Sequence, residues 1–220
     1  FEPYFDGLSI TMPFKEEMAP LLDEIDETAQ KIGAANTVVR NGSNWKGHNT
    51  DCVGALLALE EHVELKDKNV LIIGAGGTAK AIGYGVIQKG AKLTVTYNTN
   101  KERGELLAKE LDCEVMSARD IENLALDVLI NCSPVGMSPN VDQTPVSSRF
   151  LKKGITVFDS VYNPPETKLI REAKEAGCTA VSGIELFINQ AAAQFQLWTG
   201  TKAPKEAMRR IILEKIRVGL

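Results

Sequence analysis

Apolar runs of strand length alternate with segments of helical spacing through the middle of the chain. The run Asn69–Ile73 follows a short polar link, 65–68, and has the composition of a buried parallel strand. Further strands are predicted at 92–97, 127–131, 155–158 and 179–181, and helices between them at 79–88, 101–111 and 166–175. This alternation indicates right-handed βαβ units and a parallel sheet of about six strands.

The regions on either side of this block have different patterns. Residues 16–32 carry apolar side chains at helical spacing, and 36–46 has the pattern of a hairpin that turns at Asn41-Gly42. A strand is also predicted at 7–11, a linking helix at 51–63, and two further helices at 185–198 and 204–218. Segments on both sides of the parallel-sheet block could pack together into a second lobe. We therefore expect two lobes with a cleft between them.

A glycine-rich turn joins the first strand of the block to its first helix. The sequence Gly74-Ala75-Gly76-Gly77-Thr78-Ala79 has the G-x-G-x-x-A spacing of a dinucleotide-binding fingerprint in the required strand-to-helix context. Gly74 permits the tight turn, Gly76 lets the backbone approach a diphosphate, and Ala79 allows close packing of helix and strand. The helix N-terminus favours negative charge. We therefore predict a Rossmann-type doubly wound sheet that binds a dinucleotide, although the same turn could exist without a ligand.

The end of the second strand indicates which dinucleotide binds. NAD sites usually place an acidic side chain there to bind the ribose hydroxyls. This chain has Asn98-Thr99-Asn100 at the strand tip, followed by Lys101 and Arg103, which could attract a 2′-phosphate. The sequence therefore favours NADP over NAD. The alternative is that Lys101 and Arg103 are ordinary solvated charges of a first helical turn.

Composition narrows the class of protein. The chain has 220 residues, is 44% hydrophobic and carries a formal net charge of −4, which suits a folded protein and makes nucleic acid a poor partner. Its four cysteines are scattered, so neither a metal site nor a disulfide framework is expected; they are Cys52, Cys113, Cys132 and Cys178. No run is long enough to span a membrane, and no signal peptide is recognised. We expect a cytoplasmic protein. The start at Phe1 suggests a fragment of a longer chain.

Two polar clusters lie outside the dinucleotide block. Lys15 follows a predicted strand and a proline and opens a helix, where a cation is mildly unfavourable unless it points to solvent or has another role. Asp51 ends the polar loop 47–51 and could equally be a plain helix cap. Neither cluster alone establishes chemistry.

Taken in order, these segments resemble the shikimate dehydrogenase family. The resemblance rests on motifs spread over nearly the whole chain. They are Ser9-Ile10-Thr11-Met12-Pro13-Phe14-Lys15, Ile32-Gly33-Ala34-Ala35-Asn36-Thr37-Val38, Asn49-Thr50-Asp51, Asn131-Cys132-Ser133-Pro134-Val135-Gly136-Met137, Asp159-Ser160-Val161-Tyr162-Asn163-Pro164, and the segment from Gln190 to Gly200. The resemblance implies NADP-dependent interconversion of 3-dehydroshikimate and shikimate, in aromatic amino acid biosynthesis.

By this resemblance, Lys15 and Asp51 form the catalytic pair. A neighbouring carboxylate stabilises the ammonium while burial opposes it, a balance suited to a lysine that both holds and releases a proton. The resemblance further assigns substrate hydroxyl or carboxylate contacts to four side chains, namely Thr11, Asn36, Tyr162 and Gln190. It places another group beside the cofactor, comprising Asn131, Ser133 and Pro134 at a strand tip and Gly183, whose carbonyl faces the nicotinamide. Taken without the resemblance, buried amides often cap backbone groups, and Tyr162 would be a strand-end aromatic.

Several features depart from the family pattern. Many members have Asn-Arg-Thr where this chain has Asn98-Thr99-Asn100, so an arginine that grips the 2′-phosphate is missing. Leu186-Phe187 replaces a usual Met-Leu pair, and Glu185 stands where glycine is common. No Ser-x-Ser-Pro motif precedes Gly7, although family members usually carry one there. The sequence around Ser182 is similar to that of bifunctional enzymes in which a dehydroquinate dehydratase domain precedes the dehydrogenase. A plant enzyme of that kind would be plastid-located.

The expected architecture is an α/β protein with two lobes. Residues 1–51 form a partial, incomplete α/β substrate lobe, 52–186 form the NADP-binding Rossmann domain, and 187–220 are C-terminal helices that return to the substrate lobe. Quinate dehydrogenase is the nearest enzymatic alternative. Two other interpretations are a dinucleotide-binding fragment without turnover, and a structural part of a larger chain whose exposed sheet edge is covered by a partner. A dehydroquinate dehydratase domain could precede this part in the full chain.

Overall fold

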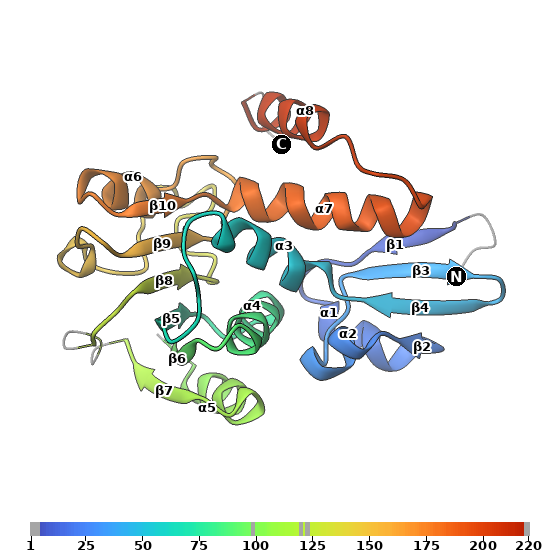
Figure 1. Cartoon of the computed structure of the whole chain (residues 1–220), viewed down its shortest axis with the longest axis horizontal. Coiled ribbons are helices and arrows are strands. Elements are labelled where there is room, and N and C mark those ends of the chain that lie inside the picture. The colour runs from blue at the N-terminus through green and yellow to red at the C-terminus, as the bar shows by residue number, and fades with distance from the viewer. Residues whose placement is uncertain (1–4, 98–99, 119–120, 122–123, 218–220) are drawn as a thin grey trace.

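The protein is described by a computed structural model, which covers all residues except 1–4, 98–99, 119–120, 122–123 and 218–220. Two sheets lie side by side, with long helices between and above them (Figure 1). One sheet has the strand order β10-β9-β8-β5-β6-β7 and all its strands are parallel. Its strands are β5 (Asn69–Ile73), β6 (Lys92–Tyr97), β7 (Glu114–Ser117), β8 (Val128–Asn131), β9 (Thr156–Asp159) and β10 (Thr179–Val181). The doubly wound parallel sheet expected from the sequence is confirmed.

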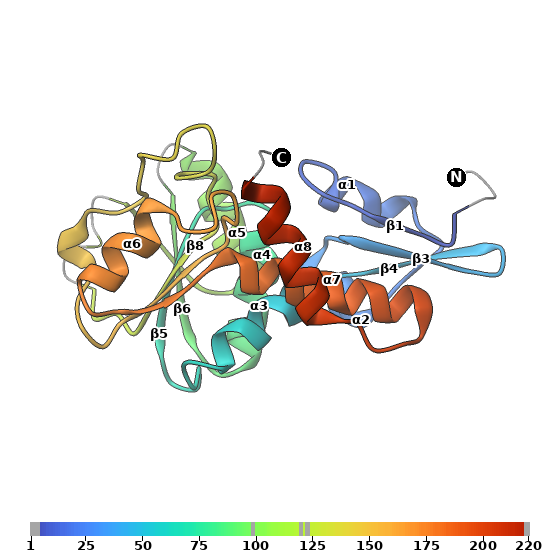
Figure 2. The ribbon, with the colours of Figure 1, turned by 90° about the horizontal axis from the view of Figure 1, so that it is seen from above.

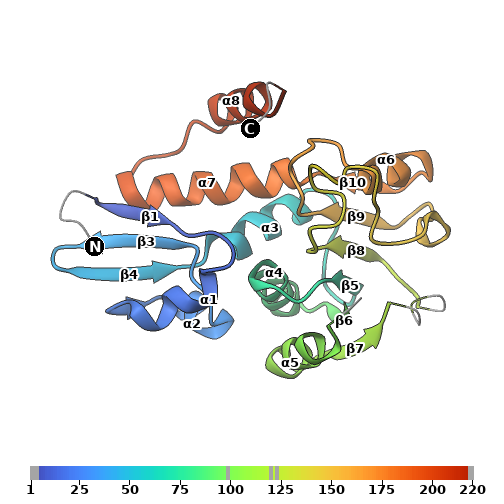
Figure 3. The ribbon, with the colours of Figure 1, turned by 180° about the vertical axis from the view of Figure 1, so that it is seen from behind.

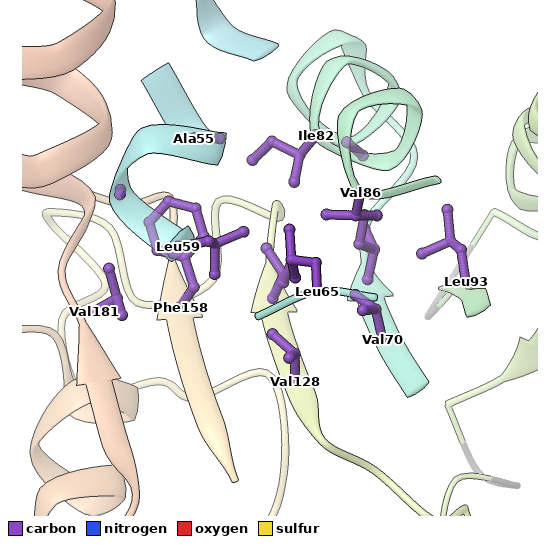
Figure 4. Packing of buried hydrophobic residues seen from close by; sticks show 14 of the residues in the cluster. Ala55, Leu59, Leu65, Val70, Ile82, Val86, Leu93, Val128, Phe158 and Val181 are labelled. Atoms are coloured by element: carbon purple, nitrogen blue, oxygen red, sulfur yellow. The ribbon is translucent and has the colours of Figure 1, made fainter. Parts of the chain in front are cut away.

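Helices cover both faces of this sheet. One face packs against α3 (Thr50–Glu60), α4 (Gly77–Gln88) and part of α5 (Lys101–Leu111), and the other against α6 (Lys168–Glu175). Figure 4 shows the first face, where Leu59 of α3 and Phe158 of β9 lie among side chains from β5, β8 and α4. Both side chains have no exposed surface. The apolar character of strands such as Asn69–Ile73 follows from this burial on two sides.

The second sheet is smaller and mixed. Its order is β1-β3-β4-β2, where β1 (Gly7–Ser9), β3 (Thr37–Asn41) and β4 (Asn44–His48) are antiparallel neighbours and β2 (Glu24–Ile25) pairs parallel to β4. The hairpin is two residues long between Asn41 and Asn44, so it turns at Gly42-Ser43 and not at Asn41-Gly42. Gly42 adopts φ +64, a left-handed conformation that glycine accepts without a steric penalty.

The helical spacing of residues 16–32 indicates one long helix, and this interpretation is wrong. The structure has instead α1 (Lys15–Met18), a 3₁₀ turn η1 (Ala19–Leu21), β2 and α2 (Glu27–Ile32). Pro20 cannot continue an α-helix because it lacks an N–H and its ring clashes with the preceding turn. Asp26 then starts α2, since its side chain accepts a hydrogen bond from Ala29 N at 2.7 Å. Apolar side chains at helical spacing thus belong to several short elements.

The C-terminal helices connect the two sheets. Helix α7 (Gly183–Thr199) begins beside β10 and runs along the edge of the small sheet, where Trp198 Nε1 donates to Val38 O at 3.0 Å. Helix α8 (Lys205–Arg217) lies over α7 (Figure 2). The reverse view shows α1 and α2 on the side of the small sheet that faces α4 (Figure 3). Helix α3 packs along α7, and together they join the two sheets.

Within the described residues, no helix combines the length and the apolar character needed to cross a bilayer.

Substitution of Leu59 tests the packing of α3 against the sheet. Leu59→Ala removes a side chain with no exposed surface, so we expect the free energy of unfolding to fall by about 2–5 kcal/mol in urea denaturation. Leu57→Ala is the matched control on the same helix, because Leu57 is 43% exposed. Its effect should stay within about 0.5 kcal/mol. Equal losses at the two positions would contradict the burial described for α3.

Candidate functional site

The glycine turn lies at the carboxyl end of β5, the edge at which ligands bind in sheets of this kind. Gly74 adopts φ +113, and a Cβ there would lie 2.9 Å from the carbonyl carbon of Cys132, so only glycine fits. Gly76 caps α4 in an extended conformation, and a Cβ on it would have open space within 4 Å. Ala79 is fully buried. The turn therefore presents free backbone at the N-terminus of α4, with room for a phosphate group.

Lys15 and Asp51 meet at the mouth of this turn. Lys15 is the first residue of α1 and Asp51 lies in the first turn of α3, and their Nζ and Oδ2 atoms are 2.5 Å apart. The side chains are only 11% and 8% exposed. Lys15 Nζ is also 3.4 Å from Thr78 Oγ1, which belongs to α4. An ammonium group, its carboxylate partner and the dinucleotide-type turn thus converge in one place.

Asn36 holds the other oxygen of this carboxylate. Its Nδ2 donates to Asp51 Oδ1 at 2.9 Å and to Thr50 Oγ1 at 3.0 Å. Its Oδ1 accepts from Thr50 N at 2.7 Å and from Thr37 Oγ1 at 2.8 Å. Asn36 is 2% exposed, so this network is closed to water. Asp51 is therefore fixed from two sides, by Lys15 and by Asn36.

Gln194 is a part of this network that the sequence reasoning did not single out. It is buried in α7, and its Nε2 donates to Asn36 O at 3.2 Å, Thr37 Oγ1 at 3.0 Å and Ser9 Oγ at 3.1 Å. It lies four residues after Gln190, which places the two amides on one face of the helix. That spacing was the available signal. Gln194 thus ties α7 to Asn36 and to Thr37, the first residue of β3.

Three of the predicted substrate-contacting residues lie on separate segments of the chain. Tyr162 is 38% exposed and its ring lies 4.6 Å from that of Phe187, centroid to centroid. Gln190 Nε2 donates to the Phe187 carbonyl oxygen at 3.1 Å, one turn back on α7. Thr11 is exposed in the link between β1 and α1, four residues before Lys15. Tyr162 and Gln190 are thus joined through Phe187, while Thr11 approaches from the lobe of Lys15.

The tip of β8 is held by a buried carboxylate. Asp159, at the end of β9, is fully buried, and its Oδ1 accepts from Asn131 Nδ2 at 2.9 Å and Val161 N at 3.0 Å. Thr167 Oγ1 donates to its Oδ2 at 2.6 Å. Ser133 Oγ in turn donates to Asn131 Oδ1 at 2.6 Å. Burial raises the pKa of Asp159 to about 6, and the three donated hydrogen bonds oppose that rise.

The other predicted cofactor positions are placed as follows. Pro134 is exposed beside Ser133. Gly183 starts α7, and a Cβ there would lie 2.3 Å from Val161 O, so only glycine lets the helix approach this strand end. Lys101 and Arg103 are exposed at the start of α5; Lys101 Nζ is 3.4 Å from Glu105 Oε1, and Arg103 Nη2 is 3.7 Å from Glu16 Oε1. Asn98 and Thr99 lie outside the described residues.

Three family models match successive parts of the chain. They are the shikimate dehydrogenase substrate binding domain over 1–38, shikimate/quinate 5-dehydrogenase over 56–147, and the shikimate 5′-dehydrogenase C-terminal domain over 183–213. Together they cover the glycine turn and the segments that carry Lys15 and Gln190.

Curated relatives and solved structures agree with these models. A shikimate dehydrogenase (NADP(+)) of Methanosarcina acetivorans is 42% identical over 97% of this chain and 80% of its own. A bifunctional 3-dehydroquinate dehydratase/shikimate dehydrogenase of Arabidopsis thaliana is 41% identical over 94% of this chain, which spans only 38% of that longer protein.

A solved shikimate dehydrogenase in complex with NADP⁺ superposes with a TM-score of 0.90, at 36% identity over 96% of this chain and 77% of that one. A quinate dehydrogenase of Corynebacterium glutamicum in complex with NAD gives 0.89, at 34% identity over 96% and 79%.

Substitution of Asp159 tests the buried carboxylate. Its folded pKa of about 6 lies above the unfolded value of about 3.9, so its contribution to stability is complete below pH about 4 and is lost as pH rises to about 6. Asp159→Asn should abolish this loss. The unfolding free energy of the variant, relative to the parent protein, should rise by about 2–3 kcal/mol between pH 4 and pH 7 in urea denaturation.

Asp142→Asn removes one charge from an exposed position and serves as the control. Parallel stability curves for Asp159→Asn and the parent protein across this pH range would show that the carboxyl group is not perturbed.

Proposed function

The chain belongs to the shikimate dehydrogenase family, and we propose that it uses NADP(H) to interconvert 3-dehydroshikimate and shikimate. One observation carries the proposal. The Lys15–Asp51 pair lies at the mouth of a strand-to-helix glycine turn, so a proton-transferring group and a dinucleotide site face the same space. Reduction of a carbonyl needs both a hydride and a proton at the same substrate group.

The residues at the turn fit a dinucleotide. We assign the diphosphate to the backbone N–H groups at the start of α4, because the space above Gly76 is open and the helix end is positive. The contributing positions are Gly74, Gly76, Gly77, Thr78 and Ala79. Lys101 and Arg103 are exposed where a 2′-phosphate would be expected, and charge-assisted hydrogen bonds would favour NADP. Asn98 and Thr99 complete this proposed region.

The nicotinamide end is assigned to the strand ends next to the glycine turn. Asn131, Ser133 and Pro134 lie at the tip of β8, and Gly183 opens α7 next to Val161. Asp159 holds these strand ends in place, because it accepts hydrogen bonds from both Asn131 and the backbone of Val161. We propose that it is a positioning residue, which holds the two strand ends at a set distance. Bound NADPH supplies the hydride for the carbonyl carbon.

Lys15 supplies the proton. During reduction the ammonium donates a proton to the substrate oxygen as negative charge develops there, and in the reverse direction the neutral amine accepts it from the hydroxyl group. Asp51 stabilises the ammonium at 2.5 Å and orients it, while Asn36 prevents rotation of the carboxylate by holding Oδ1. Low exposure of both side chains strengthens these interactions.

The remaining polar side chains that the family resemblance singled out are assigned to the substrate. Thr11, Tyr162 and Gln190 carry groups that donate and accept hydrogen bonds, as recognition of hydroxyl and carboxylate groups requires. Asn36 remains a candidate for substrate contact, although its bonds to Asp51 and Thr50 support a positioning role first. We propose that residues 1–51 and the helices 187–220 form the substrate lobe, and 52–186 the dinucleotide lobe.

Removal of the Lys15 amine tests the catalytic assignment. Lys15→Ala should lower the rate of NADP⁺ reduction by shikimate by about 10²–10⁴-fold, because the proton acceptor is lost. NADP⁺ affinity should change little. Lys31→Ala, at an exposed lysine paired with Glu27, is the control and should keep the parental rate. Unchanged turnover in Lys15→Ala would refute its role, and the same assay with quinate and NAD⁺ would reveal a quinate dehydrogenase.

Substitution of Gly76 tests the diphosphate site separately. In Gly76→Ala the new methyl group enters open space, so the fold should lose no more than about 1 kcal/mol, while NADP⁺ binding weakens at least about tenfold because the phosphate can no longer approach. Gly74→Ala is the contrasting variant. Its φ of +113 and the 2.9 Å approach to Cys132 should destabilise the fold itself. Calorimetric titration and thermal unfolding distinguish the two; undiminished NADP⁺ binding by Gly76→Ala would overturn this placement.

A further inference from the structure

An ion pair joins the two lobes beside the proposed cofactor site. Glu16 follows Lys15 on α1, and its Oε1 lies 3.7 Å from Arg103 Nη2 on α5. Their side chains are 46% and 57% exposed. Arg103 is one of the two cations assigned above to the 2′-phosphate of NADP. The carboxylate of Glu16 therefore occupies a place in which a phosphate would find the same partner.

The position of Glu16 is fixed by more than this pair. The backbone carbonyl of the preceding residue, Lys15, accepts a hydrogen bond from Ala35 N at 2.8 Å, and the Lys15 side chain forms an ion pair with Asp51. A Cβ built on Gly77 would lie 3.6 Å from Lys15 Cβ and 3.9 Å from Glu16 Oε1. The carboxylate of Glu16 thus lies close to the N-terminus of α4 as well as to Arg103, between two positive sites that would bind cofactor phosphates.

We propose that Glu16 is a specificity-determining residue that competes with the 2′-phosphate for Arg103 and so reduces the preference for NADP over NAD. This inference rests on the proposed function, because it presumes that the chain binds a dinucleotide at the glycine turn. A guanidinium binds a doubly charged phosphate more strongly than it binds a carboxylate. Arg103 therefore leaves Glu16 and binds the 2′-phosphate when NADP binds. The negative charge of Glu16 stays nearby and repels the phosphate.

The exchange requires little energy. An exposed ion pair at 3.7 Å is weak in water, so releasing Arg103 from Glu16 is not a large barrier. Repulsion between Glu16 and a nearby phosphate is larger, because the 2′-phosphate carries close to two negative charges at neutral pH. NAD lacks the 2′-phosphate, so Glu16 repels only its diphosphate. Neutralising Glu16 should therefore favour NADP selectively.

Cofactor titrations of the whole chain without substrate test this. For Glu16→Gln we expect the ratio of the Kd for NAD⁺ to the Kd for NADP⁺ to rise about three- to tenfold at low ionic strength. The rise should shrink at about 0.5 M salt, where exposed charges are screened. Glu17→Gln is the matched control: it removes the same charge from the next exposed position on α1 and should leave the ratio within about twofold.

A double-variant comparison shows whether Glu16 acts through Arg103. Arg103→Gln alone should lower NADP⁺ affinity, and in that background the effect of Glu16→Gln on the ratio should be smaller than in the parent protein.

The inference is overturned if Glu16→Gln weakens NADP⁺ binding, or if it shifts both cofactors equally and to the same extent as Glu17→Gln. Failure of the parent protein to bind either dinucleotide would instead contradict the proposed function, and the inference with it. Normal NADP⁺ binding with an unchanged ratio in Glu16→Gln contradicts the inference alone.

Discussion

The carboxylate of Asp51 is the point at which three segments of residues 1–51 converge. One oxygen binds the ammonium of Lys15 in α1 and the other the amide of Asn36, which lies just before β3, while Asp51 itself belongs to α3. A carboxylate at 8% exposure is tolerated only because both oxygens are satisfied. Loss of either partner would leave one oxygen of this buried carboxylate without a hydrogen-bond donor. The sequence order of the small lobe, strand then lysine then hairpin then α3, is what brings these groups together.

Helix α3 transmits this arrangement to the rest of the molecule. Its first turn carries Asp51, whereas Leu59 near its other end is buried against the parallel sheet. In between, Gly54 allows α7 to approach closely, since a Cβ on Gly54 would lie 2.8 Å from Gln190 N. Asp51 and Leu59 therefore belong to one helix that packs between the parallel sheet and α7. Packing near the far end of α3 thus helps to set the position of the Asp51 carboxylate.

Local signals in the sequence were sufficient for the large sheet and insufficient for the small lobe. Asn69–Ile73 and Lys92–Tyr97 have the predicted bounds. The first is a nearly continuous apolar run, as expected for a strand buried on both faces, and the second is rich in Thr, Val and Tyr, which favour strands. Strand β7 was missed, since it is four residues long at the sheet edge and only partly buried. The segment 16–32 was read as one helix because periodicity records which side chains are apolar, and not which neighbours bury them.

The site itself shows the same division between local and long-range information. The glycine turn is a contiguous signal, whereas the contact between Lys15 and Asp51 spans 36 positions and followed only from the family resemblance. Gln194 contacts Ser9 from 185 positions away, and no local pattern marks such a pair. The same short helix that brings Lys15 to Asp51 also brings Glu16 to Arg103, so the groups proposed for proton transfer and for cofactor recognition lie on one element. A movement of α1 that loosens one of these contacts must therefore disturb the other.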